Sequence, residues 1–265
     1  MAISIEELKA LFNRISPEDI AESWDHSGVQ IDAGRDLISR ILICLDVTAD
    51  IVEEAIKTDT DLILSHHPLI FNPLYAIENQ DYLGGLLVRL IKSNISVYAM
   101  HTAFDSVKGG NNDYLAEVLD LTDIQGLAPG LSEDRTGLGR RGKFTGSRTL
   151  EETVAMVKHA LDIRTPIAYV GDPRSHVKHV AICTGSGASQ IVLASQTGCD
   201  VLITGDVGYH DALKAKAMGL SVIDAGHFHS EKIFVRNVAE QLKVLVENKI
   251  EILASQTDQN PFNML

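Results

Sequence analysis

The chain of 265 residues is poor in cysteine and contains no long apolar segment. Its three cysteines, Cys44, Cys183 and Cys199, show no CxxC spacing and imply no disulfide framework, which suits a reducing compartment. Cys44 and Cys183 lie inside apolar runs, so we interpret them as small core residues. No stretch approaches the length of a transmembrane helix, and the first residues are acidic where a secretory signal peptide is basic. We therefore expect a soluble, cytoplasmic protein without a membrane partner.

Positive charge is scarce as well. Lysine and arginine number 23 against 36 aspartates and glutamates, which gives a formal net charge of -13. Such a surface repels the phosphates of nucleic acids, so we do not expect a nucleic acid as a partner. One dense basic cluster stands out, which we interpret as a solvated loop, and it consists of Arg135, Arg140, Arg141, Lys143 and Arg148.

A P-loop sequence, which would bind the phosphates of a nucleotide, is also absent. The segment "CTGSGAS" at 183–189 leaves two interpretations open. It is either a weak phosphate-binding loop before a helix or a tight turn from a strand into a helix.

The segments that are present predict an α/β fold. Apolar residues at helical spacing between Ile5 and Ile15 predict a first helix that ends before Pro17. From residue 40 onward, strand-like and helical segments alternate, with strands expected at 40–47 and 61–68, a strand that leads into a loop at 95–105, and helices at 48–58 and 82–94. This alternation favours a sheet with largely parallel pairing.

The second half of the chain repeats the order of the first. "HVAICTGSG" corresponds to "RILICLDV", and Val180 lies 139 residues after Ile41. Further along, the offset between Val97 and Val222 falls to 125 residues, so one connection is shorter in the second copy. We interpret this pattern as an internal duplication of one αβ unit.

The two copies set the expected domain organisation. We predict a first αβ half at 1–126 and a second at 127–265, with the option that the C-terminal helix packs back on the first half. The linker between the copies is short.

Polar side chains gather at the ends of the repeated strands. "SHH" at 65–67 corresponds to "TGD" at 204–206, and "MHTAFD" at 100–105 corresponds to "AGHFHSE" at 225–231. Ligands of parallel α/β sheets bind at the carboxyl ends of the strands. A pair of loop histidines facing water is the alternative for "SHH" alone, but it does not explain polar residues at all four strand ends. We therefore predict one site formed by His66, His67, Asp105, His227 and Glu231.

This set of three imidazoles and two carboxylates predicts a metal site. Mixed nitrogen and oxygen ligands suit zinc, iron or manganese, whereas magnesium and calcium favour oxygen alone. Adjacent residues of an extended strand diverge, so we expect His66 and His67 to bind two different ions. His227 and Glu231 share one face if a helix begins there, and Glu231 is long enough to bridge both ions. We predict two divalent metal ions with coordination positions left for water, as a catalytic site requires.

Three further residues near the strand ends are candidates for other roles. His101 is a candidate catalytic residue that either shuttles protons or orients a metal ligand. Asp206, a second catalytic candidate, and His210 lie at the equivalent strand end of the second copy and are expected to line the pocket. His229 alternates away from His227 in an extended segment, so we expect it outside the ligand set.

The motifs "SHHP", "HTAFDSVKGGNND", "VLITGD" and "DAGHFHSE" together resemble those of the dinuclear-metal-centre proteins known as GTP cyclohydrolase I type 2 homologues, or Nif-three-like proteins. The resemblance covers nearly the whole chain, from "WDHSGVQI" to the final helix, and implies the Nif-three-like fold. It also implies that His66 and His227 bind one ion, that His67 and Asp105 bind the other, and that Glu231 bridges them. A ring-shaped homohexamer with its metal sites facing the interior is implied as well.

Two hypotheses about function are open. The first is a dinuclear metal-dependent hydrolase of a small molecule, one form of which is cyclohydrolase-type ring opening of a nucleotide or another heterocycle. The second is a metal-binding scaffold or regulatory interaction protein without catalysis. The substrate is not specified by either the residues or the resemblance.

Overall fold

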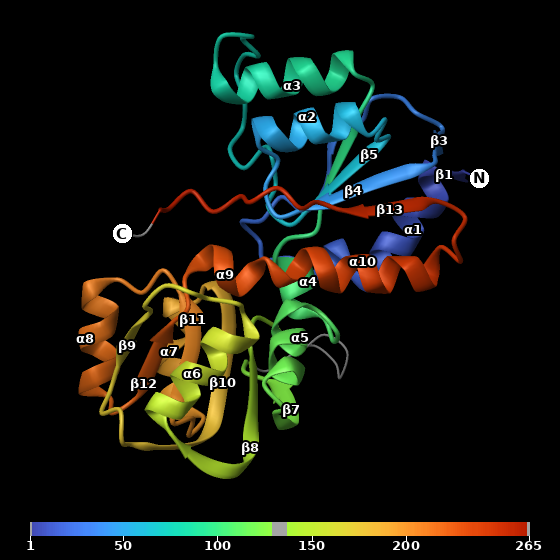
Figure 1. Cartoon of the computed structure of the whole chain (residues 1–265). Coiled ribbons are helices and arrows are strands. Elements are labelled where there is room, and N and C mark those ends of the chain that lie inside the picture. Colours follow the sequence, from blue (N-terminus) through green and yellow to red (C-terminus); the bar gives the residue numbers. More distant parts are fainter. Residues whose placement is uncertain (1, 129–136, 264–265) are drawn as a thin grey trace. The chain divides into compact units, whose positions relative to one another are not determined.

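The structure, a computed structural model, describes residues 2–128 and 137–263 of the chain. The chain forms two compact units, which Figure 1 shows coloured along the sequence: unit 1 is Met1–Phe104 with Phe234–Pro261, and unit 2 is Asp105–Ile233 with Phe262–Leu265. The chain leaves unit 1 inside helix α4 (Thr102–Ser106) and returns to it at Phe234. The division into 1–126 and 127–265 follows the two copies of the repeat and stays a prediction.

Unit 1 is built around a mixed sheet of five strands. In sheet order these are β13 (Glu251–Ala254), β4 (Arg40–Cys44), β5 (Leu62–Ser65), β6 (Ser96–Ala99) and β2 (Gly28–Ile31). Only the pairing of β2 with β6 is antiparallel. Every residue of β5 and β6 is buried, as expected for parallel strands that are covered on both faces.

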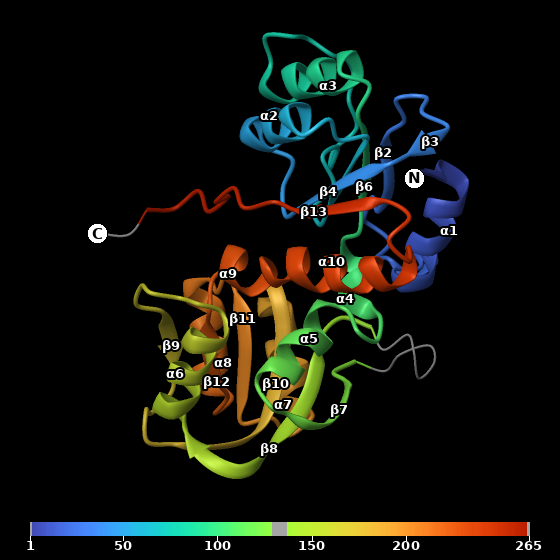
Figure 2. The ribbon, with the colours of Figure 1, turned by 45° about the vertical axis from the view of Figure 1, so that its right-hand side comes forward.

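Helices cover the two faces of this sheet. Figures 1 and 2 show α2 (Ala49–Lys57) and α3 (Tyr82–Lys92) side by side over one face, where their apolar residues share a core with the strands. Thr48 caps α2 by accepting a hydrogen bond from the main chain of the first turn. On the other face, α1 (Ile5–Ile15) places Phe12 against Tyr98 of β6, with ring centroids 4.8 Å apart. The remaining elements of unit 1 are β1 (Ile3–Ser4), η1 (Glu18–Ile20), β3 (Leu37–Ile38) and most of α10 (Ile233–Leu245).

Unit 2 contains a mixed sheet of six strands. In sheet order these are β7 (Thr122–Gly126), β8 (Arg140–Thr149), β10 (His176–Ser186), β11 (Val201–Gly205), β12 (Ser221–Asp224) and β9 (Ala168–Val170). The central strands β10, β11 and β12 are parallel, and the outer pairings are antiparallel.

Two pairs of helices enclose the sheet of unit 2. The apolar residues of α5 (Asn111–Val118) and α6 (Leu150–Ala160) share one core with the strands, and those of α7 (Ile191–Gln196) and α8 (Tyr209–Ala217) share another on the opposite face. The short helices η2 (Ala188–Gln190) and α9 (His227–Glu231) follow the ends of β10 and β12.

The strand registers confirm the duplicated α/β architecture. Ile41 lies opposite Leu62 in unit 1, and Val180 lies opposite Val201 in unit 2, so each partner is shifted by 139 residues. The next strand pairs, β5 with β6 and β11 with β12, also keep equivalent registers. The repeat found in the sequence is therefore a repeat of three parallel strands.

The interpretation of the basic cluster as a solvated loop is wrong. Arg140 begins the strand β8, and its side chain is 1% exposed and paired with Asp113 at 2.9 Å. The burial of Arg140 is possible because its guanidinium also donates to main-chain carbonyls of 106, 107, 137 and 139. Arg135 lies outside the described residues.

Two other expectations concern cysteine and the membrane. Cys44, Cys183 and Cys199 are buried free thiols, which confirms the prediction that Cys44 and Cys183 belong to the core. No helix among residues 2–128 and 137–263 has both the length and the apolar character needed to span a bilayer.

Candidate metal centre

Unit 1 brings three of the predicted site residues together. β5 ends at Ser65, and His66 and His67 follow in a bend, so their side chains no longer alternate as in a strand. The two imidazole rings lie with centroids 5.0 Å apart. The ring of His101, which follows β6, lies 5.4 Å from that of His66 and 5.5 Å from that of His67. His66 is fully buried, and the other two are partly exposed.

Each of these three histidines has its Nδ1 atom against an oxygen. His66 Nδ1 lies 2.8 Å from the carbonyl oxygen of Met100, which can only accept, so Nδ1 carries the proton. His67 Nδ1 lies 2.8 Å from Asp46 Oδ1, and His101 Nδ1 lies 2.7 Å from an oxygen of Asp25. In a neutral ring held in this way, Nε2 carries the lone pair. Metal-bound histidines are oriented by the same kind of contact.

Asp25 holds the loop before β2 against the end of β6. Its side chain has no exposed surface and accepts hydrogen bonds from Ser27 Oγ, Thr102 Oγ1 and the main-chain N–H of Thr102, besides the contact with His101. Burial alone would raise the pKa of this carboxyl group. The hydrogen bonds from His101, Thr102 and Ser27 outweigh burial and hold the pKa of Asp25 well below its ordinary value. Asp25 is therefore a buried anion that fixes the orientation of His101.

In unit 2, Asp105 is held by two consecutive asparagines at the start of α5. Asn111 Nδ2 donates to Asp105 Oδ1 at 3.1 Å, and Asn112 Nδ2 donates to the Asp105 carbonyl oxygen at 3.1 Å. Asn112 Oδ1 also accepts the main-chain N–H of Thr184 at 2.9 Å, so Asn112 ties the end of α4 to β10. All four residues are buried. The position of the Asp105 carboxylate is thus fixed by a polar network.

The carboxylates of Asp105 and Glu231 both influence the pKa of one thiol, that of Cys183. Burial raises the pKa of Cys183 to about 12, and the negative charges of Asp105 and Glu231 add to this increase. Two carboxylates that influence one buried sulfur lie in the same part of unit 2.

His227 lies between two carboxylates in unit 2. Its Nδ1 is 2.7 Å from Asp206 Oδ2, and its Nε2 is 2.8 Å from Glu231 Oε2. Helix α9 starts at His227, which places Glu231 one turn later on the same face, as predicted from the spacing. A neutral imidazole has one proton and cannot donate to both carboxylates. Such an arrangement requires either a second proton or a cation between Nε2 and Glu231.

Gly185 makes room for the Glu231 carboxylate. A Cβ atom on Gly185 would lie 1.9 Å from Glu231 Oε1, and the residue has φ of +67°, which favours glycine. The main-chain N–H of Gly185 donates to Ser230 Oγ at 3.0 Å, so the end of β10 is attached to α9. These contacts agree with the interpretation of "CTGSGAS" as a tight turn from a strand into a helix.

The fold and these contacts can now be compared with known proteins. The model of the Duf34/NIF3 (NGG1p interacting factor 3) family matches residues 3–261. The chain belongs to this family. A relative named GTP cyclohydrolase 1 type 2 homolog from Clostridium perfringens is 34% identical over 99% of this chain and 100% of its own length. A protein named GTP cyclohydrolase 1 type 2 from Helicobacter pylori strain J99 is 37% identical over 90% of this chain and 91% of its own.

Solved structures of the NIF3 family share the fold over the whole length. The crystal structure of a Bacillus cereus protein related to NIF3 has a TM-score of 0.94 and 28% identity, and the match covers 100% of this chain and 99% of that one. A Staphylococcus aureus protein has a TM-score of 0.89 and 30% identity over 99% of both chains. The expected Nif-three-like fold is confirmed.

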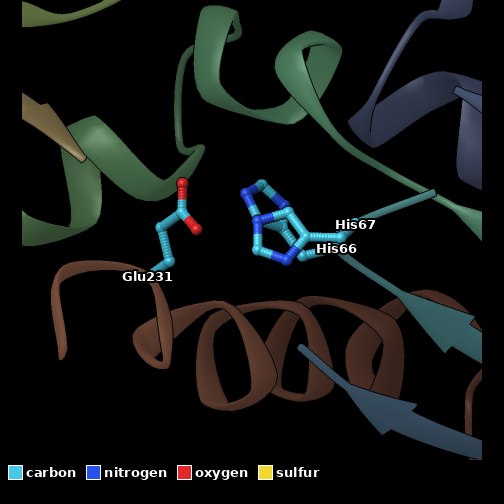
Figure 3. A group of neighbouring side chains, drawn as sticks. All are labelled: His66, His67 and Glu231. Carbon is cyan, nitrogen blue, oxygen red and sulfur yellow. The ribbon is translucent and has the colours of Figure 1, made fainter. Parts of the chain in front are cut away.

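Figure 3 draws three of the predicted ligands of this NIF3-family chain, His66, His67 and Glu231. Each offers one ligand atom, a ring nitrogen or a carboxylate oxygen. The two histidines belong to unit 1, and Glu231 belongs to unit 2. Two other histidines have ring contacts of their own: the ring of His210, exposed on α8, contacts Tyr209, and that of His229 contacts Phe228.

Sequence reasoning missed the residues that hold the candidate ligands and His101. Asp25, Asp46, Asn111 and Asn112 carry no metal-site spacing of their own. A usable signal for the asparagines was present, since "GGNND" follows Asp105 within the same motif. Asp25 could have been suspected from "WDHS", where a carboxylate interrupts the helical pattern.

Proposed function

We propose that this NIF3-family chain is a hydrolase that depends on two divalent metal ions. One observation carries the proposal: His66, His67 and His227, the three histidines expected to be ligands, all have Nδ1 against an oxygen atom. That contact orients an imidazole so that Nε2 faces a metal ion. Three of the proposed ligands could together hold such an ion: His66, His67 and Glu231.

The donor set fits divalent zinc, iron or manganese. Neutral imidazoles and carboxylates are suitable ligands for these ions, and ligand bonds to zinc are about 2.0–2.2 Å long. The separation of 2.8 Å between His227 Nε2 and Glu231 Oε2 suits two donor atoms that share one ion. In the proposed arrangement, His66 and His227 bind one ion, His67 and Asp105 bind the other, and Glu231 bridges them. Part of the proposal is that the two units close to form this centre.

The residues around the centre have separate roles in this proposal. Two bound metal ions would supply a hydroxide at neutral pH and stabilise negative charge on the attacked atom. His101, oriented by Asp25, would accept or donate a proton through Nε2. Asp206 would hold the imidazole of His227 in the orientation that binding requires. The names of the relatives support a ring-opening hydrolysis of a nucleotide or related heterocycle as the reaction.

Metal analysis and a substrate screen test this function together. Purified chain should contain close to two transition-metal ions, and a screen of nucleotides, phosphoesters and cyclic amides should reveal turnover that a chelator abolishes. Glu231→Gln should reduce turnover strongly in protein that still contains metal. Turnover that survives complete removal of metal would refute the proposal, and metal binding without any turnover would favour the scaffold hypothesis.

We also propose that the chain assembles into a ring-shaped homohexamer in the cytoplasm, as the family resemblance implies. The net charge of -13 would keep such rings from associating further. Light scattering at micromolar concentration should give six times the mass of the chain, and a monomeric mass would contradict the assembly.

A further inference from the structure

Four aromatic rings form an exposed cluster beside the histidines of unit 1. Trp24 and His26 come from the loop before β2, Phe71 comes from the segment that follows His67, and the fourth ring is His101. The Trp24 ring centroid lies 6.2 Å from that of Phe71 and 5.8 Å from that of His101. Phe71 lies 6.4 Å from His26 and 6.5 Å from His101. We call this group the aromatic cluster.

The aromatic cluster leaves much apolar surface open to solvent. Trp24 is 51% exposed and Phe71 is 46% exposed, although large aromatic side chains are normally well buried. The rings meet at steep angles, 53° for Trp24 with Phe71 and 77° for Trp24 with His101, so the cluster is not a closed stack. Exposed aromatic surface of this kind can contact another planar molecule.

Polar contacts hold in place the two segments that carry the exposed rings, the loop before β2 and the segment that follows His67. Asp25, between Trp24 and His26, is anchored at the end of β6 by Thr102 and His101. Gln30 joins the second segment to the first, because its Nε2 donates to the His26 carbonyl oxygen at 2.6 Å and its Oε1 accepts the main-chain N–H of Ile70 at 3.1 Å. Phe71 directly follows Ile70. The exposure of these rings is therefore built into the fold of unit 1.

We propose that the aromatic cluster binds the substrate by stacking on a planar heterocycle such as a nucleobase. Ring stacking recognises any flat π-system, so a cluster of four rings is suited to a planar ring. His101 belongs both to the cluster and to the group with His66 and His67. A heterocycle stacked on Trp24 or Phe71 would lie beside the proposed proton-transfer residue. This inference rests on the proposed function, in which the substrate is a heterocycle. Binding of a heterocycle to the cluster can nevertheless be measured without turnover.

Trp24 is the only tryptophan of the chain, which makes it a reporter for this cluster. Full-length protein treated with a chelator is titrated with adenosine, guanosine, cytidine or a pterin, and Trp24 fluorescence is excited at wavelengths where the ligands absorb weakly. We expect saturable quenching by at least one of the heterocycles and none by ribose 5-phosphate. Because metal and catalysis are absent, failure of the hydrolase proposal would leave the quenching intact, and failure of the stacking proposal would leave metal-dependent turnover intact.

Substitutions at Phe71 separate stacking from simple apolar contact. Phe71→Leu keeps an apolar side chain but removes the ring, and it should weaken binding about five-fold or more, while Phe71→Tyr should bind as the parent does. Tyr82→Ala is the control, because Tyr82 is an exposed ring of unit 1 at the start of α3 and is not one of the four rings of the aromatic cluster. Circular dichroism checks the fold of each variant.

Three results of the ligand titrations would overturn the proposal. They are the absence of saturable quenching by all four heterocycles, equal quenching by ribose 5-phosphate, and equal affinity of the parent and Phe71→Leu. Trp24 emission that changes with the protein concentration, and not with the ligand concentration, would instead assign the cluster to contacts between copies of the chain. That result would also overturn the proposal.

Discussion

Gly185 shows how a single residue without a side chain can determine the position of a candidate ligand. The space that a Cβ atom would need at Gly185 is taken by the carboxylate of Glu231. Gly205 has a similar role, since a Cβ atom there would lie 2.6 Å from the main-chain nitrogen of His227. Both glycines stand where a strand of unit 2 ends, and both allow α9 to approach the sheet. Small residues at these strand ends are thus part of the site.

We predict that Gly185→Ala lowers the metal content. The new methyl group would displace the Glu231 carboxylate, which is the proposed bridging ligand. Gly219→Ala is a matched control, because Gly219 has a similar φ of +71° but a Cβ atom added there would meet no described atom within 4 Å. Both variants should lose about 1–2 kcal/mol of stability from the strained backbone, and only Gly185→Ala should lose metal in elemental analysis. Equal metal contents in the two variants would contradict this role of Gly185.

The lowered pKa of Asp25 predicts that the free energy of unfolding depends on pH. The pKa of Asp25 is lowered in the folded chain, so its charge stabilises the fold above the pKa of the unfolded state, about 3.9, and this contribution is lost as pH falls toward the folded pKa. Asp25→Asn should therefore cost about 1–3 kcal/mol at pH 7, because an amide N–H then faces hydrogen-bond donors. Urea unfolding should show a smaller difference between parent and variant at pH 3. A difference that stays constant between the two pH values would argue against an ionised Asp25.

At the scale of elements, local patterns predicted the strands and helices that carry the histidines. The apolar run that becomes β5 ends before His66, and Thr48 caps α2, as both segments indicate by themselves. The partners that orient the histidines of the site could not be predicted in the same way, because His101 and Asp25, for example, are 76 residues apart in sequence. Burial of Arg140 was missed for a related reason: its partner Asp113 is 27 residues away, and charge clusters are normally solvated.

The pair formed by Arg140 and Asp113 should stabilise the junction between β8 and the loop after Asp105. Asp113 also accepts the main-chain N–H of Gly109 at 2.9 Å, so one buried ion pair holds both segments. Arg140→Met or Asp113→Leu alone should cost about 3–5 kcal/mol, because each leaves a buried charge without its partner. The double variant should cost less than the sum of the two. Urea unfolding of all four proteins gives the coupling energy, and simple additivity would mean that the pair does not act as a unit.

At the scale of the whole molecule, duplication has given equivalent strand ends different roles. Asp206 stands 139 residues after His67, at the equivalent position after β11. The first copy thus presents a histidine ligand candidate, and the second presents a carboxylate that orients His227. Gly205 likewise stands where the first copy has His66. The chain topology explains how one ancestral strand end could supply both a ligand and the group that orients one.

The last prediction tests whether the two halves form one dinuclear centre. Asp105 is proposed to bind one ion and Glu231 to bind both, so their removal should have different effects on metal stoichiometry. Asp105→Ala should empty mainly one position, whereas Glu231→Ala should weaken both, and Glu240→Ala, which removes an exposed carboxylate of α10 paired with Arg236, should change neither.

Elemental analysis and calorimetric titration of the metal-free variants measure these occupancies directly. Residual binding in Glu231→Ala would report the affinity that the four other proposed ligands supply without the bridge, namely His66, His67, Asp105 and His227. If Asp105→Ala and Glu231→Ala both retained two ions with the affinity of the parent, neither carboxylate would be a ligand. The paired histidines after β5 would then have to bind metal with other partners.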